Sequence, residues 1–291
     1  MRNVRIRHFN RSLLRVKSIE TNPSRYRVVR WLYYGRDFSD ISPWMEISTA
    51  VTQRLEHHGI RFIFERCDAV RLRDIHRRGE QPDELLLLAT LPTKFQGLFA
   101  NFKRAALVIG LPFPGIQLPF ISIDILSALQ HAVHMLVRRG FSRISLIHKE
   151  GSRQAMTEQF KQICARSSQV IWGDVIHLPV ELHEQNMATQ RLAATIKGHH
   201  ALIVNYPVSA GLLMTALLQK GVKVPGHVEV VAMNTMMYAI RVVPIPIYYP
   251  YPVERLAKAI ALAAIYYFKH GHLSPLRKMI PLEMIADHSH L

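Results

Sequence analysis

The sequence predicts an α/β protein of two lobes, each with a mostly parallel sheet flanked by helices. From residue 25 to residue 285, short apolar runs alternate with longer amphipathic stretches, which is the pattern of repeated strand–helix units. The strand signals are too numerous for one comfortable sheet, which favours two lobes. A chain of 291 residues with 49% apolar residues is large enough to form both cores.

In the first half of the chain, apolar runs bounded by turn residues predict strands at residues 26–34, 60–65, 84–89, 105–109 and 120–123. Amphipathic stretches between them predict helices at residues 43–58, 70–78 and 93–102. Pro43 suits the first turn of its helix, and Gly59 is a typical stop. Residues 110–119 contain three prolines and are expected to form a loop.

The second half continues the same alternation. Its predicted helices cover residues 126–139, 153–166, 184–196, 208–220 and 253–270. Its predicted strands lie at residues 144–147, within 170–178, and at 201–205, 228–233 and 278–285. Gly140 and Gly221 are placed to end two of the helices, and the proline-rich segment 244–252 precedes the last one.

The charge of the chain is strongly positive. It has 37 Lys and Arg against 21 Asp and Glu, a formal net charge of +16, which excludes an acidic disordered scaffold. Residues 1–24 form a basic arm or linker remnant, in which we expect weak contacts with the DNA backbone. The residues expected to make them are Arg2, Arg5, Arg7 and Arg11. An inert linker is the alternative interpretation.

The location of the protein is predicted to be cytoplasmic, without membrane association. No apolar run approaches the ~20 residues that span a bilayer, and no secretory signal follows the basic start. Cys67 and Cys164 are far apart and lack a CxxC partner, which fits a reducing compartment.

The motifs of common catalytic sites are missing from the sequence. No two glycines have G-x-G spacing, so neither a dinucleotide fingerprint nor a phosphate loop is present, and no cofactor is expected. There is no G-x-S-x-G and no H-E-x-x-H. His131 and His134 have helical spacing, but such pairs without further ligands are usually packing or surface residues. We therefore expect no catalytic residues and no metal site.

Three segments resemble the ligand-binding domains of the lactose and galactose repressor family. Residues 126–147 read LSALQHAVHMLVRRGFSRISLI, and residues 201–233 follow the family's order of strand, helix, turn and strand. Residues 252–259 resemble its late helix, which a proline precedes. The stretch GVKVPGHVEVV at residues 221–231 is the most specific match, because its glycine and proline positions reflect backbone geometry. The subgroup fused to a GntR-type winged helix is the most similar.

The resemblance implies a periplasmic-binding-protein-like class I fold, with two α/β lobes joined by three strand crossovers and a small molecule held in the cleft. Carried onto this chain, the first lobe would comprise residues 25–142 plus 246–272. The second would comprise residues 143–245 plus 273–291. Residues 1–24 are too few for a DNA-reading head, so the head is expected to be missing from this chain, either lost or encoded upstream.

The resemblance also indicates which residues would line the cleft. They are Phe38, Ser42, Trp44, Thr90, Asp124, Arg153, Met156, Tyr206, Asn234 and Tyr249. Tyr206 and Pro207 stand where sugar-binding members usually have Asn and Asp, and Met156 aligns with a position that often holds a sugar-binding arginine. Such a cleft would favour an aromatic ligand, or a sugar held mainly by stacking. Alternatively, these aromatic residues are core and the cleft binds nothing.

The family implies an effector-binding and dimerisation domain of a bacterial transcription regulator, not an enzyme. We expect a homodimer whose contacts include Leu212, Leu213 and Leu217, together with the helix segment at residues 47–55, although these side chains could instead be internal core. The alternatives are a free-standing solute-binding protein, an enzyme on a shared α/β fold, and a degenerate member without a ligand.

Overall fold

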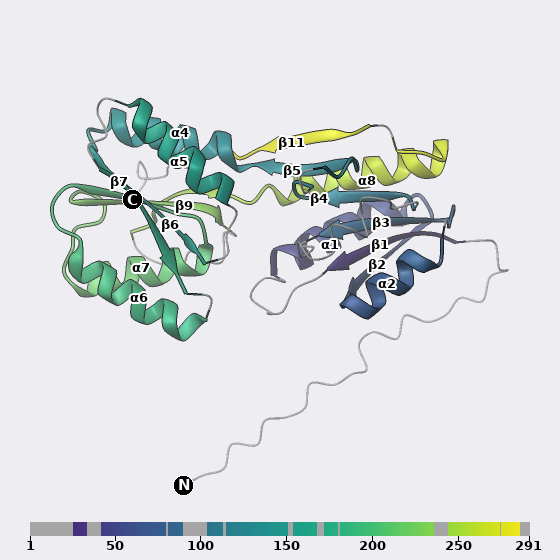
Figure 1. Cartoon of the computed structure of the whole chain (residues 1–291), viewed down its shortest axis with the longest axis horizontal. Coiled ribbons are helices and arrows are strands. Elements are labelled where there is room, and N and C mark those ends of the chain that lie inside the picture. Colours follow the sequence, from purple (N-terminus) through teal and green to yellow (C-terminus); the bar gives the residue numbers. More distant parts are fainter. Residues whose placement is uncertain are drawn as a thin grey trace, which may run out of the picture.

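The computed structural model describes residues 26–33, 42–79, 81–89, 104–112, 115–150, 154–167, 172–179, 181–235, 244–273 and 275–285. Within them the chain forms two sheets of parallel strands, each flanked by helices, and the two lobes lie side by side along the long axis of the molecule (Figure 1). The predicted α/β fold class is therefore confirmed. The helix expected at residues 93–102 lies outside the described residues.

The first sheet has six parallel strands in the order β11-β5-β4-β3-β1-β2. Their bounds are β1 Arg27–Tyr33, β2 Ile60–Arg66, β3 Glu84–Ala89, β4 Ala106–Ile109, β5 Phe120–Asp124 and β11 Arg277–Pro281. Helices α1 (Ser42–Glu56) and α8 (Val253–His270) share a core with one face of this sheet. Helix α2 (Ala69–Arg77) packs on the other face, over Leu32, Leu86 and Leu88.

The second sheet has five parallel strands in the order β10-β9-β8-β6-β7. Their bounds are β6 Arg143–Lys149, β7 Trp172–Leu178, β8 His200–Val204, β9 Val228–Thr235 and β10 Ile247–Pro250. Helices α4 (Ile125–Arg138) and α5 (Gln154–Arg166) cover one face. Helices α6 (Leu182–Thr195) and α7 (Pro207–Gln219) cover the other.

The chain passes between the two lobes three times, as the resemblance implies. It leaves the first sheet at the end of β5 and enters α4 directly, with Asp124 capping that helix through its bond from the Ser127 amide (3.1 Å). It returns from β10 to α8, and finally runs from β11 to Ile285, which pairs with Tyr248 of β10. None of the described helices is long and apolar enough to cross a bilayer.

The lobe boundaries differ from those expected. Helix α4 packs on the second sheet because its buried side chains, including Leu129 and Val133, share a core with Ile144 and Leu146 of β6. Strand β10 belongs to the second sheet and β11 to the first. The first lobe therefore consists of the described residues in 26–124 and 253–281, and the second of those in 125–250 and 282–285.

Candidate functional site

The carboxyl ends of the two sheets are directed at each other. All pairings in each sheet are parallel, so each sheet has one carboxyl edge. Strands β5 and β11 end where the chain enters the second lobe, and β10 ends where the chain enters the first lobe. The edges at which ligands of open parallel sheets bind therefore lie on the two sides of the crossovers.

An aromatic cluster lies at the edge of the first lobe. Trp44, in the first turn of α1, is half-buried and contacts the buried Trp31 of β1 edge-to-face, with ring centroids 5.5 Å apart. Trp44 also contacts Tyr251 in the second crossover edge-to-face, with ring centroids 6.3 Å apart. Tyr33, the last residue of β1, stacks on Phe64 of β2 at 5.9 Å. Trp31 and Tyr33 are buried, so the half-buried rings of Trp44 and Tyr251 are the part of this cluster that could stack against a sugar ring or an aromatic ring.

A cation and a second aromatic ring lie at the edge of the second lobe. Lys149 ends β6, and its Nζ lies 5.1 Å from the ring centroid of Tyr206, which follows β8. Both side chains are half-buried. The cation–π contact holds the ammonium beside the ring, so one polar and one stacking group are presented together.

Two histidines lie at the same edge of the second sheet, on the opposite face of the sheet from Lys149. His148 is buried, and its Nε2 lies 3.1 Å from the Thr157 hydroxyl of α5. Its ring centroid is 4.6 Å from that of the exposed His177. Burial, and secondarily the neighbouring His177, lowers the pKa of His148. Its imidazole is therefore held in the neutral form, which can both donate and accept a hydrogen bond.

The crossovers are tied to the lobes by polar contacts. The hydroxyl of Tyr249 in β10 lies 2.7 Å from Nδ1 of His131 in α4, and burial raises the pKa of that hydroxyl to about 12. Arg255, in the first turn of α8, donates to Glu283 (2.6 Å) and to the Pro281 carbonyl (2.9 Å) of the third crossover. The contacts of Arg255 tie the start of α8 to the third crossover, whereas the Tyr249–His131 contact joins β10 to α4 within the second lobe.

The structure brings only part of the predicted site together. Trp44, Asp124 and Tyr206 lie at the facing edges. Met156 and Tyr249, 4% and 1% exposed, pack in the core of the second lobe because they point toward its helices and sheet. Ser42 and Asn234 have only their backbone described, at the start of α1 and near the end of β9. The remaining expected residues lie outside the described residues: Phe38, Thr90, Arg153, Arg2, Arg5, Arg7 and Arg11.

The leucines expected at a dimer interface are mostly internal. Leu213 and Leu217 are fully buried in the core between α7 and the second sheet, and Leu212 is half-buried. In α1, Ile47 and Leu55 are likewise fully buried against the first sheet. In this structure most of these apolar side chains therefore belong to the intramolecular core, which was the alternative interpretation.

Sequence reasoning missed Lys149, His148 and His177. Each occupies one of the last two positions of a strand that is followed by a helix, which is the position from which side chains reach the carboxyl edge. A search of the strand ends for polar residues would have found them. Among the described residues, no group of three or more His, Cys, Asp and Glu side chains is placed to hold a metal ion.

The arrangement is suited to binding, since it combines stacking surfaces with a few polar groups. Comparison with known protein families agrees with this: residues 133–286, more than half of the chain, match the model of the periplasmic binding protein-like domain. No curated protein matches the sequence.

Solved structures with the same fold are numerous. A probable maltose operon transcriptional repressor from Staphylococcus aureus superposes with a TM-score of 0.75 at 13% identity, over 91% of this chain and 98% of that one. A LacI family transcriptional regulator from Bifidobacterium animalis subsp. lactis gives 0.75 at 17% identity, over 90% and 97%. The transcriptional regulator CelR in complex with cellobiose gives 0.70 at 15% identity, over 89% and 83%. The chain belongs to the periplasmic binding protein-like domain family and has the two-lobed fold found in LacI-type transcription regulators.

Proposed function

We propose that this chain is the effector-binding and dimerisation domain of a bacterial transcription regulator, acting in the cytoplasm, and that it binds a small sugar-like or aromatic molecule between its lobes. The observation that carries the proposal is the position of two stacking surfaces at facing sheet edges, Trp44 with Tyr251 on one side and Tyr206 with Lys149 on the other. The family match and the regulators that share the fold support it.

The mechanism is a change of population and needs no catalysis. A ligand that touches both edges binds the closed arrangement of the lobes more tightly than the open one. Its differential affinity then shifts the equilibrium, and coupling between two sites of a regulator is typically ~1–3 kcal/mol. Stacking on Trp44 and Tyr206 would supply much of the binding free energy, while Lys149 and Asp124 would orient polar groups of the ligand.

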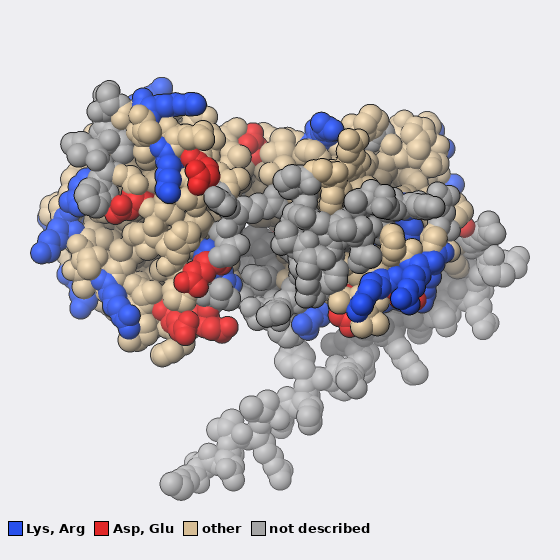
Figure 2. All heavy atoms as spheres, viewed as in Figure 1, with Lys and Arg blue, Asp and Glu red and all other residues tan. Residues whose placement is uncertain are grey.

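DNA would be contacted by a DNA-reading head of the regulator, with the arm containing Arg2, Arg5, Arg7 and Arg11 adding phosphate contacts. The basic side chains of the described surface are spread over both lobes and gather over α2, where Arg73 and Arg77 are exposed (Figure 2). Dimer contacts would come from exposed apolar side chains such as Leu218 of α7 and Met187 of α6 rather than from the buried Leu213. Sedimentation velocity of the wild type and of Leu218→Asp tests the dimer.

Thermal unfolding in the presence of single compounds tests the ligand proposal. We expect at least one compound in a panel of mono- and disaccharides, nucleosides and aromatic metabolites to raise the Tm, because a ligand at 100 times its Kd stabilises by ~2.7 kcal/mol. Trp44→Ala should abolish most of that shift. Tyr266→Ala is the matched control, since this exposed tyrosine lies on α8 away from the facing edges. No shift with any compound, or an equal shift in Trp44→Ala, would contradict the proposal.

A further inference from the structure

The first lobe has one end that faces away from the second lobe, formed by the amino ends of its parallel strands. Because the helices run back against the strands, α1, α2 and α8 end at this amino end, where β2, β3 and β11 begin. Figure 1 shows the start of β1, the end of α8 and the start of β11 there. The basic arm that precedes β1 in the sequence therefore joins the lobe at its amino end.

Exposed basic side chains gather at the amino end of the first lobe. They come from the starts of three strands and from the ends of α2 and α8: Arg27, Arg61, Arg77, Lys269, Arg277 and Lys278. The helix dipole favours basic residues at helix ends, but it does not account for those at strand starts. Arg73 lies one turn before Arg77 on α2 and is also exposed, so the basic surface continues over this helix (Figure 2).

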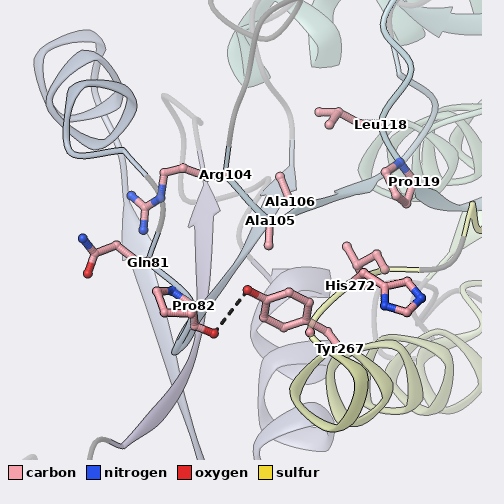
Figure 3. Close-up of a pocket in the computed structure, with 11 residues that line it drawn as sticks. Gln81, Pro82, Arg104, Ala105, Ala106, Leu118, Pro119, Tyr267 and His272 are labelled. Atoms are coloured by element: carbon pink, nitrogen blue, oxygen red, sulfur yellow. Dashed lines mark hydrogen bonds between the residues drawn. The ribbon is translucent and has the colours of Figure 1, made fainter.

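Contacts between distant segments hold these side chains in fixed places. The guanidinium of Arg27 lies 6.0 Å from the ring centroid of Phe268, which brings the start of β1 beside the end of α8. The Tyr267 hydroxyl donates to the Pro82 carbonyl (3.2 Å), so the end of α8 is also fixed to the segment before β3 (Figure 3). The parallel pairing of β1 with β2 places Arg61 beside the start of β1. The basic side chains of these elements therefore share one built surface.

The six basic side chains of the amino end are not neutralised by ion pairs. None of them forms a salt bridge with a residue that the structure describes. Two nearby carboxylates already have other partners: Glu84 accepts from Arg30 (2.6 Å) and from Arg104, and Asp74 accepts from Arg78 (2.7 Å). Those two carboxylates therefore offset arginines outside the group of six.

The acidic side chains of the first lobe are concentrated at its other end. Glu46, Asp68 and Glu254 are exposed and lie at or just before the starts of α1, α2 and α8, near the facing edges. At the amino end, the described residues add the exposed Glu56 and the half-buried Asp83. Two carboxylates do not balance six basic side chains, so the amino end carries a net positive charge.

We propose that the amino end of the first lobe is a DNA-docking surface, which contacts the phosphate backbone of a duplex without reading its sequence. Exposed arginine and lysine side chains without acidic partners suit a polyanion, because each phosphate contact releases counterions. The position favours DNA, since a duplex held by the basic arm lies next to the same surface. The inference rests on the proposed function as a regulator. The effector site lies at the opposite edge of the same sheet, so the two surfaces can be changed separately.

The test measures binding of the full chain to a fluorescent DNA duplex of about 25 base pairs by anisotropy, at NaCl concentrations from ~20 to ~200 mM. The docking variant combines Arg61→Gln, Arg77→Gln and Lys269→Gln, which remove three positive charges from β2, α2 and α8 at the amino end. All three side chains are exposed and lack ion pairs with described residues, so their removal leaves the core in place.

The matched control combines Arg166→Gln, Arg191→Gln and Lys220→Gln. These exposed side chains lie on α5, on α6 and at the end of α7 in the second lobe. The control loses the same net charge and keeps the arm, so a difference between the two variants reports the position of the charges.

We expect the docking variant to bind the duplex at least about tenfold more weakly than the wild type at ~50 mM NaCl. The slope of log K against log [NaCl] should become less steep by ~2–3, because each lost phosphate contact removes about 0.9. The control should weaken binding less than about threefold and keep the slope within ~1 of the wild type. The rise in Tm with a compound from the thermal screen should be the same in all three proteins.

The docking proposal is overturned if the wild type does not bind the duplex at ~20 mM NaCl, or if the docking variant and the control bind it equally well. It is also overturned if the docking variant loses binding to single-stranded RNA and keeps binding to the duplex. A failure of the effector site shows separately, as no rise in Tm with any compound. If the docking variant does not fold, Arg73→Gln combined with Arg77→Gln decides, since both side chains are exposed on α2.

Discussion

At the scale of single residues, buried histidines make the second lobe sensitive to acid. His148 contacts Thr157, and Nε2 of the buried His200 lies 2.8 Å from the Ser145 hydroxyl. Burial is the main cause that lowers the pKa of both, aided for His148 by His177 and for His200 by Arg143. The unfolded chain therefore binds protons more readily than the folded chain as the pH falls below ~6.5.

We predict that the free energy of unfolding is at its full value above pH ~7 and falls as the pH is lowered from there toward ~5.5, a range in which most carboxylates remain ionised. His148→Gln should reduce this loss, because glutamine keeps a polar contact for Thr157 without titrating. His183→Gln, at an exposed position of α6, is the control. Urea denaturation at the two pH values measures the difference. If the wild type and His148→Gln lose the same free energy of unfolding between the two pH values, the protonation of His148 does not contribute to the loss and the prediction is wrong.

Residue roles were only partly predictable from the sequence. Trp44, Tyr206 and Asp124 lie at the facing edges, as the resemblance implies. Met156, expected to line the cleft, and Leu213, expected at a dimer interface, both pack in the core of the second lobe, because contacts with distant elements decide what a helix face packs against. The buried position of Arg104 was not anticipated either, because it is held by Glu84 and the Ile75 carbonyl, which lie 20 and 29 positions away in the chain.

At the scale of elements, α8 shows how small side chains permit close packing. Alanines at positions 257, 261 and 264 are at most 3% exposed, and the helix packs on α1 and the first sheet through this face. Its opposite face exposes Leu262 (54%) and Tyr266 (40%). The end of the helix is set by Gly271, which has φ +76°.

We predict that Ala264→Leu destabilises the protein by ~1–3 kcal/mol, because the added carbons have no space between α8 and its neighbours. Leu262→Ala, on the exposed face of the same helix, should change the free energy of unfolding by less than ~0.5 kcal/mol. Chemical denaturation of both variants measures the contrast. If Ala264→Leu is as stable as the wild type, close packing of the alanine face of α8 does not limit the size of the side chains there, and the account of this helix is wrong.

Elements with strong local signals were predicted well, and their assignment to a lobe was not. The proline-rich segment before the helix predicts a start at residue 253 for a helix over residues 253–270, which agrees with α8 at Val253–His270. The last strand was expected at residues 278–285, but β11 ends at Pro281, after which the chain crosses to pair with Tyr248. Pairing between distant segments decides which sheet a strand joins, and periodicity within one strand carries no information about it.

At the scale of the whole molecule, two sheets with facing carboxyl edges are joined by three short crossovers. Because the three connections between the lobes are short and lie together, the lobes can rotate about them as a hinge while each lobe keeps its own core. The buried clusters agree with this division, since one core unites α1, α8 and the first sheet, and another unites α4, α5 and the second. The central claim is that a small molecule closes these lobes on one another.

The distance between the lobes in solution is the most direct test of that claim. Spin labels at Met45→Cys and Leu182→Cys would sit on exposed helix starts at the two facing edges. The native Cys67 and Cys164 are buried, and burial raises their thiol pKa to about 12 and about 11, so they should react slowly. Double electron–electron resonance is recorded with and without a saturating compound from the thermal screen. We predict a shorter mean distance with the compound; an unchanged distance distribution would contradict closure of the lobes.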